Sequence, residues 1–135
     1  MPKIVLTDAS ITINAVALSD HANSVTLTYE KDQIEVTAFG STGHEYDAGL
    51  QNNSCEISLM QDFAASSVEA TIYPLVGTRT TVVLKPTSGA VSATNPSYTI
   101  TNAYLASHTP IMGGVGELAM TTLTFTGGTL AKATA

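Results

Sequence analysis

The 135-residue chain has no tryptophan, one cysteine, one arginine and only 12% charged residues. Aromatic residues total 6%, which argues against a carbohydrate-binding module and against a protein that stacks single-stranded bases on aromatic platforms. The five lysines and arginines are scattered, which argues against a nucleic-acid-binding protein, because binding a phosphate backbone needs clustered cations. The single cysteine, Cys55, excludes an intramolecular disulfide, and we expect it to be a buried free thiol.

Long apolar runs are absent as well. No stretch approaches the roughly 20 apolar residues that a helix needs to span a bilayer. The first ten residues, MPKIVLTDAS, contain no apolar segment of signal-peptide length. We therefore expect a chain that is made in the cytoplasm and has no membrane partner.

The net charge of −6 is unevenly distributed. Ten of the eleven acidic residues lie between Asp8 and Glu69, so residues 1–69 sum to −8 and residues 70–135 to +2. An acidic surface repels phosphates, and it suits a passage along which nucleic acid slides without being bound.

Catalytic and metal-binding patterns are missing. The histidines fall in three separate connections or strand ends, without partners at metal-ligand spacing: His21, His44 and His108. Glu30 with Asp32, and Glu45 with Asp47, form carboxylate pairs, but an exposed glycine-rich segment does not supply the pocket that acid–base catalysis requires. The sequence thus predicts no catalytic residue, no metal site and no cofactor, and we expect a protein that is not an enzyme.

Alternating apolar and polar residues predict a series of β-strands. Val25, Leu27 and Tyr29 share one face of such a strand, and Thr side chains occupy the other. The expected strands cover residues 3–7, 10–18, 25–30, 54–61, 80–85, 98–111 and 117–126, with a short edge strand at 34–39.

One helix is expected after Asp62, which is suited to cap residues 63–73. Pro74 cannot continue the hydrogen bonding, so the helix should end near Tyr73. Its apolar stripe consists of Ala65, Val68, Ile72 and Leu75.

These elements predict a mainly β fold, an antiparallel β-sandwich or barrel with one flanking α-helix and a long central loop. Residues 1–135 are expected to form a single domain, with residues 127–135 as a flexible tail. We expect a flexible loop at residues 86–97 and a bend at residues 112–116.

The long central loop is the most distinctive feature of the chain. The segment between Glu30 and Asn52, EKDQIEVTAFGSTGHEYDAGLQN, is charged and rich in glycine. Long loops inside compact domains are uncommon and usually functional. Because no catalytic residues surround it, we expect an arm that reaches a neighbouring copy of the same protein.

Three stretches together resemble the tail tube protein, or major tail protein, of long-tailed bacteriophages. The first is residues 21–59, HANSVTLTYEKDQIEVTAFGSTGHEYDAGLQNNSCEISL. The second is the short helix after Met60 to Phe63, and the third is the ending GGVGELAMTTLTFTGG. The resemblance covers most of the chain.

This resemblance implies a structural virion protein that forms homo-hexameric rings stacked into a hollow tube. Sheets of adjacent subunits would join into a continuous inner barrel, and DNA would pass through the lumen as cargo without specific binding. Implied partners are further copies of the chain and other tail proteins, namely the tape measure, tail terminator and distal tail proteins. The implied location is the phage tail, assembled in the host cytoplasm.

The resemblance also assigns roles to residues. The loop 31–51 would contact the next ring through Lys31, Asp32, Ile34, Phe39, His44, Tyr46, Asp47 and Leu50. Candidates for the lumen surface are Glu30, Glu35 and Glu56, whose strand parity decides whether they face inward. Two other readings stay open, a capsid decoration or minor virion protein and a sandwich-type carbohydrate-binding module.

Overall fold

The computed structural model describes residues 5–134, and within them the chain forms ten strands, one short α-helix and two 3₁₀ turns. All ladders between the strands are antiparallel, and the expected mainly β class with one flanking helix is confirmed. The elements are β1 Ser10–Ile13, β2 Val16–Ala17, η1 Ser19–His21, β3 Ala22–Thr28, β4 Lys31–Glu35, β5 Tyr46–Gln51, β6 Ser54–Met60, α1 Val68–Ile72, η2 Tyr73–Leu75, β7 Arg79–Lys85, β8 Ser97–His108, β9 Met120–Thr126 and β10 Thr129–Ala133.

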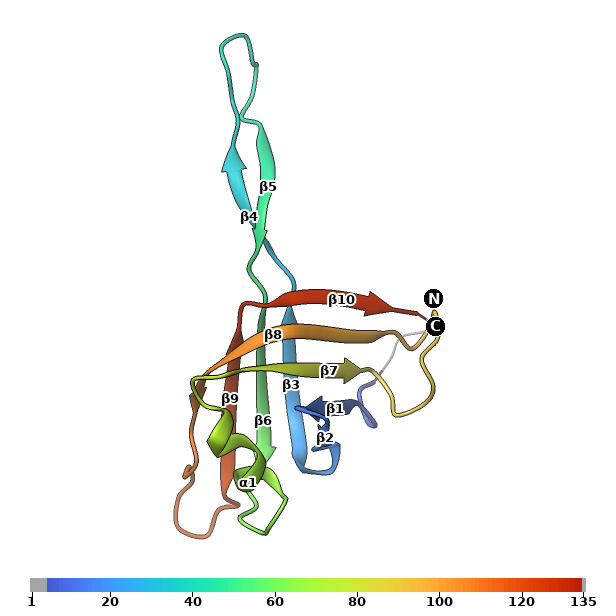
Figure 1. Ribbon diagram of the computed structural model, residues 1–135, viewed down its shortest axis with the longest axis vertical. Helices are drawn as coiled ribbons and strands as arrows, with labels where there is room; N and C mark the ends of the chain where they lie inside the picture. Colours follow the sequence, from blue (N-terminus) through green and yellow to red (C-terminus); the bar gives the residue numbers. More distant parts are fainter. Residues whose placement is uncertain (1–4, 135) are drawn as a thin grey trace.

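The body consists of one sheet folded into two layers, in which β3, β6 and β9 run across β7, β8 and β10 (Figure 1). The long strand β8 belongs to both layers: residues 97–101 pair with β10, and residues 104–108 pair with β9. Asn102 stands between these halves with a φ of 61°. Strands that change layers in orthogonal packing do so at such bends.

The bend in β8 corrects one expectation from the sequence. Simple alternation places Tyr98, Ile100, Asn102 and Tyr104 on one face. In the structure Ile100 is buried whereas Tyr104 is 44% exposed. The irregularity at Asn102 reverses the side-chain parity, since a residue with positive φ breaks the strand geometry.

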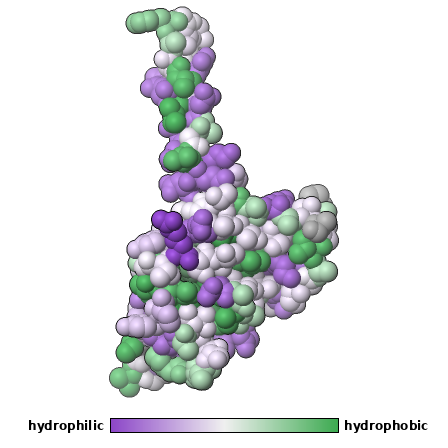
Figure 2. Space-filling model, viewed as in Figure 1, coloured by the Kyte–Doolittle hydropathy of each residue, from purple (hydrophilic) through white to green (hydrophobic). Residues whose placement is uncertain are grey.

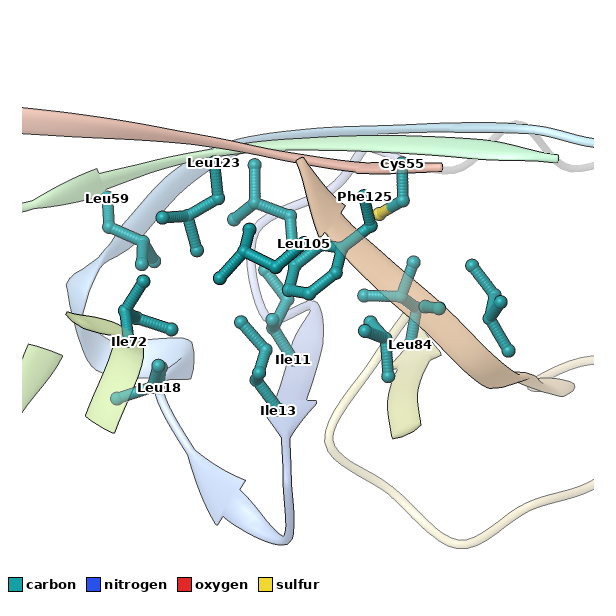
Figure 3. Close-up of a cluster of buried hydrophobic side chains, with 14 of the residues drawn as sticks. Ile11, Ile13, Leu18, Cys55, Leu59, Ile72, Leu84, Leu105, Leu123 and Phe125 are labelled. Carbon is teal, nitrogen blue, oxygen red and sulfur yellow. The ribbon is translucent and has the colours of Figure 1, made fainter. Parts of the chain in front are cut away.

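The core lies between the two layers, where apolar side chains from both point toward one another (Figure 3). Cys55, Ile57 and Leu59 of β6 are all buried, as their alternation predicts. Leu123 and Phe125 of β9 join them. Each buried Ile, Leu or Phe side chain stabilises the fold by about 1.5–3 kcal/mol when it leaves water.

The C-terminal segment is part of the sheet, which corrects the expected flexible tail. β10 pairs with β8 over five residue pairs, and Leu130 packs against the core. The chain reaches β10 through Gly127 and Gly128, whose φ angles are 75° and 83°. A side chain at Gly128 would meet the Thr101 carbonyl oxygen at 2.6 Å, so this tight turn requires glycine.

The N-terminal strands also differ from expectation. Residues 10–18 form a tight hairpin, β1 and β2, because Asn14 and Ala15 adopt φ angles of 50° and 65° that reverse the chain. Of the strand expected at residues 3–7, Lys3 and Ile4 lie outside the described residues. Residues 5–7 form no strand.

The helix is shorter than its sequence predicts. Asp62 does not cap a helix at residue 63; its carboxylate accepts hydrogen bonds from the Ala64 amide at 2.9 Å and the Ser67 hydroxyl at 2.7 Å. Ser66 has a φ of 61°. Residues 62–67 are therefore occupied by a turn, and α1 begins only at Val68.

The apolar stripe of the helix is confirmed in its second half. Val68 and Ile72 are buried and Leu75 packs against the core, whereas Ala65 lies in the turn and is exposed. The regular helix ends at Ile72, one residue before Tyr73, as the position of Pro74 predicts.

Candidate assembly interface

The central segment is a β-hairpin that projects from the body as an arm, defined here as residues 30–52 (Figure 1). It is a pair of strands, β4 and β5, and not the loop with an edge strand at 34–39 that the sequence predicts. Asn52 donates its amide to the Glu30 carbonyl at 2.8 Å and closes the base. Val36 donates to the Glu45 carbonyl at 2.8 Å and extends the pairing toward the tip.

The tip is a tight turn around glycine. Ser41 donates its amide to the Ala38 carbonyl at 3.1 Å, and Gly40 has a φ of 93°. This turn presents Phe39 with its side chain fully in solvent, at 109% of the reference exposure. A free aromatic ring at the end of an arm is typical of an anchor for another surface.

The two faces of the arm carry different side chains. Strand alternation places Gln33 and Glu35 with Tyr46 on one face, where His44 donates to Glu35 at 2.6 Å and its ring lies 6.4 Å from that of Tyr46. The other face carries Asp32, Ile34 and Val36 beside Glu45 and Asp47.

The arm has no core of its own. Every residue of β4 is exposed, and the space-filling view shows apolar and hydrophilic side chains interleaved along a narrow column (Figure 2). A two-stranded hairpin that packs on nothing is marginally stable in water. Its exposed apolar side chains are Ile34, Val36, Phe39, Tyr46 and Leu50. The arm therefore needs a partner surface to be held in one conformation.

All eight residues predicted to contact the next ring lie on this arm. The three acids predicted to face a lumen are not brought together. Glu35 lies on the arm and Glu30 lies at its base. Glu56 lies in β6 on the outer face of the sheet, because its neighbours Cys55 and Ile57 point into the core.

The outer face around Glu56 is covered by hydroxyl groups, a feature that the sequence reading missed. The ladders β3–β6 and β6–β9 align outward-facing residues in three rows across three strands. This hydroxyl face consists of Ser24, Thr26, Thr28, Ser54, Glu56, Ser58, Thr122, Thr124 and Thr126. The sequence shows alternating Ser and Thr residues in three strands, but only the register between the strands places them side by side on one face.

Two histidines join the helix region to the sheet. Nδ1 of His21 lies 2.9 Å from the Asp20 carboxylate and Nε2 lies 2.9 Å from the Asp62 carboxylate. These carboxylates, Asp20 foremost, raise the pKa of His21 above its ordinary value. The pKa of Asp62 is lowered, first by the Ala64 amide, then by the Ser67 hydroxyl and His21.

The second histidine, His108, is buried between Glu69 of α1 and Thr121 of β9. Its Nε2 lies 2.8 Å from the Glu69 carboxylate, and the Thr121 hydroxyl lies 3.1 Å from Nδ1. The order hydroxyl, imidazole, carboxylate is that of a hydrolase triad, but Thr121 has no exposed surface and cannot reach a substrate. This network holds α1 against the sheet.

Among residues 5–134 no cluster of three His, Cys, Asp or Glu side chains is placed to hold a metal ion. Burial raises the pKa of Cys55 to about 12, so its thiol stays protonated and unreactive at neutral pH. No helix in the described part of the chain has the length and apolar character to cross a membrane.

No protein-family model and no curated protein matches the sequence. Solved structures do match. A chain of the SPP1 tail tube is 12% identical with a TM-score of 0.77, covering 98% of this chain and 80% of its own. A chain of the virion of a native gene transfer agent particle is 14% identical with a TM-score of 0.73, covering 97% and 99%.

A third match is a chain of the PVC sheath-tube complex, an extracellular contractile injection system in its extended state. It is 11% identical with a TM-score of 0.72, and the match covers 98% of this chain and 93% of that one. At such identities the likeness establishes a common architecture. The chain therefore has the fold found in the SPP1 tail tube, in the gene transfer agent virion and in a contractile injection system.

Proposed function

We propose that this protein is the structural subunit of a phage-type tail tube. Copies associate into rings, expected to be hexameric, and the rings stack into a hollow tube located in the virion tail. The tube conducts DNA during ejection without binding it specifically. Its other partners are the proteins that fill, terminate and tip such a tail, namely the tape measure, tail terminator and distal tail proteins.

The observation that carries this proposal is the arm. A hairpin without a core, ending in a fully exposed Phe39, is only marginally stable alone and becomes stable when it packs against another molecule. The fold is shared with tube and injection assemblies, so a second copy of the chain is the partner that accounts for it best. The arm residues from Lys31 to Leu50 named above are the proposed contacts between rings.

The hydroxyl face supports the conduit role. Its nine outward residues include a single charge, Glu56, and no cation. Hydroxyl groups hydrate well, and a lone carboxylate repels phosphates, so DNA would slide along this surface without being trapped. Among residues 5–134, β3 pairs with β6 alone, so it presents a free edge to which the sheet of a neighbouring copy can add. Of the three candidate acids, Glu56 is the one we assign to the lumen.

Negative-stain electron microscopy of the purified protein over a range of concentrations tests the proposal. We expect tubes of uniform width with an open channel, formed without other proteins. A protein that stays monomeric at every concentration contradicts the tube function. Monomers that bind only to capsids would instead favour the decoration-protein reading.

A further inference from the structure

A pocket of about 630 Å³ lies where the arm leaves the body. Lys31 and Leu50 of the arm line it together with Arg79 of β7, Tyr104 of β8 and the turn at residues 126–129. These two cations are part of a total of five lysines and arginines in the chain. The space-filling view shows a strongly hydrophilic patch on the body just below the arm (Figure 2).

The cations of this base pocket, defined by Lys31, Leu50, Arg79 and Tyr104, are unpaired. Among the described residues, no carboxylate lies within 4.0 Å of the Lys31 or Arg79 charge. Both side chains are exposed, as are Leu50 at 80% and Tyr104 at 44%. The pocket thus offers two positive charges beside apolar surface.

The arm carries the complementary set of groups. Asp32, Glu45 and Asp47 lie on one face of the hairpin, which we call the acidic face, with Ile34 and Val36 among them. No side-chain hydrogen bond or ion pair within the described residues engages these three carboxylates. Carboxylates that share one face of a strand pair repel one another, and approaching cations relieve this repulsion.

Strand alternation places Lys31 of the base pocket and Asp32 of the acidic face on opposite sides of β4. In β4, Lys31 alternates with Gln33 and Glu35 on one side, whereas Asp32 alternates with Ile34 and Val36 on the other. One copy therefore cannot bring its own acidic face to its own pocket. Two copies can meet in a head-to-tail contact, with the acidic face of one copy in the base pocket of the other. The resulting pair still has one free acidic face and one free pocket, so further copies can add to it.

We propose that the base pocket receives the acidic face of the arm of a second copy, with Glu45 and Asp47 pairing with Lys31 and Arg79. Ile34 and Val36 then cover Leu50 and Tyr104 at the same contact. This inference rests on the proposed function, because it specifies which surfaces join the copies. It assigns the two pocket cations to assembly and not to DNA.

Charge reversal tests the contact. In one variant, Lys31→Glu and Arg79→Glu reverse the pocket; in another, Glu45→Lys and Asp47→Lys reverse the acidic face. Each variant alone should raise the critical concentration for polymerisation by about tenfold or more, since two attractive charge pairs become repulsive. An equimolar mixture of the two should restore assembly, because each pocket then meets an arm of opposite charge.

The matched control is Lys132→Glu, which reverses an exposed cation of β10 outside the pocket and should polymerise like the unaltered protein. Circular dichroism confirms that each variant is folded. If the unaltered protein forms tubes while the pocket variant assembles normally, or the mixture is not rescued, the pocket assignment is wrong and the tube function stands. If the unaltered protein does not polymerise, the proposed function itself fails. A pocket variant that assembles normally but loses affinity for DNA would assign the cations to nucleic acid instead.

Discussion

At the scale of single residues, Gly128 is the position where the fold tolerates a side chain least. It has a φ of 83°, and a Cβ would lie 2.6 Å from the Thr101 carbonyl oxygen. We expect Gly128→Ala to lower the free energy of unfolding by about 2–4 kcal/mol, through strain and the displacement of β10. Urea denaturation measures this change.

Gly127 is the matched control for that substitution. Its φ of 75° is also positive, but nothing lies within 4 Å of a Cβ built there. Gly127→Ala should therefore cost only about 1 kcal/mol of conformational strain. Equal losses for the two variants would mean that β10 is not packed against β8 as described.

Cys55 gives a second test at this scale. Its side chain is 1% exposed and the pKa of its thiol is raised by burial to about 12. We expect no reaction with Ellman's reagent in the folded protein at pH 8 and one equivalent in denaturant. Rapid modification of the native protein would contradict the core assignment of β6.

His21 predicts a dependence of stability on pH. Because its pKa is raised above the ordinary 6.5, protonated His21 stabilises the fold fully below pH 6.5, and this contribution disappears as pH rises through the folded-state pKa. The lowered pKa of Asp62 keeps its charge present above its ordinary 3.8. His21→Gln should therefore lower the melting temperature more at pH 5.5 than at pH 9. A loss that is the same at both pH values would show that the charge of His21 contributes nothing.

At the scale of elements, the sequence predicted best where one face of a strand is buried. β6 alternates cleanly because Cys55, Ile57 and Leu59 meet the core. β4 and β5 are exposed on both faces, so only the weak alternation at residues 34–39 suggested a strand, and the rest of the hairpin was predicted as a loop. The sequence also did not predict two local backbone conformations. The positive φ of Asn102 reverses the side-chain parity of β8, and the positive φ of Ser66 accompanies a turn that moves the start of α1 to Val68.

The arm is also the element whose removal separates folding from assembly. Deletion of residues 40–48 takes away the turn that presents Phe39 and part of β5, but none of the core residues. We expect a folded monomer with a melting temperature within a few degrees of the intact chain, and no polymers by sedimentation velocity. The control replaces Ser41 and Thr42 with glycine, which preserves the length of the arm and should preserve polymers. Long tubes from the shortened chain would refute the role of the arm.

At the scale of the whole molecule, the structure combines a body with one hydroxyl-covered face and an arm that extends far beyond it (Figure 1). The candidate site was partly accessible from the sequence, since the length and charge of the central segment marked it as an arm and the resemblance to tail tube proteins assigned its contact residues. The hydroxyl face and the base pocket were not, because both are made by residues that only the sheet register and the folding of β7 and β8 bring together.

The central claim is that a second copy covers the arm. Amide hydrogen exchange of residues 31–51, compared between dilute protein and sedimented assemblies, tests it most directly. We expect these amides to exchange within seconds in the dilute chain, since the hairpin is marginal alone, and to be protected by about a hundredfold or more in the assemblies. Arm amides that exchange equally fast in both states, while the body is protected in both, would contradict the account.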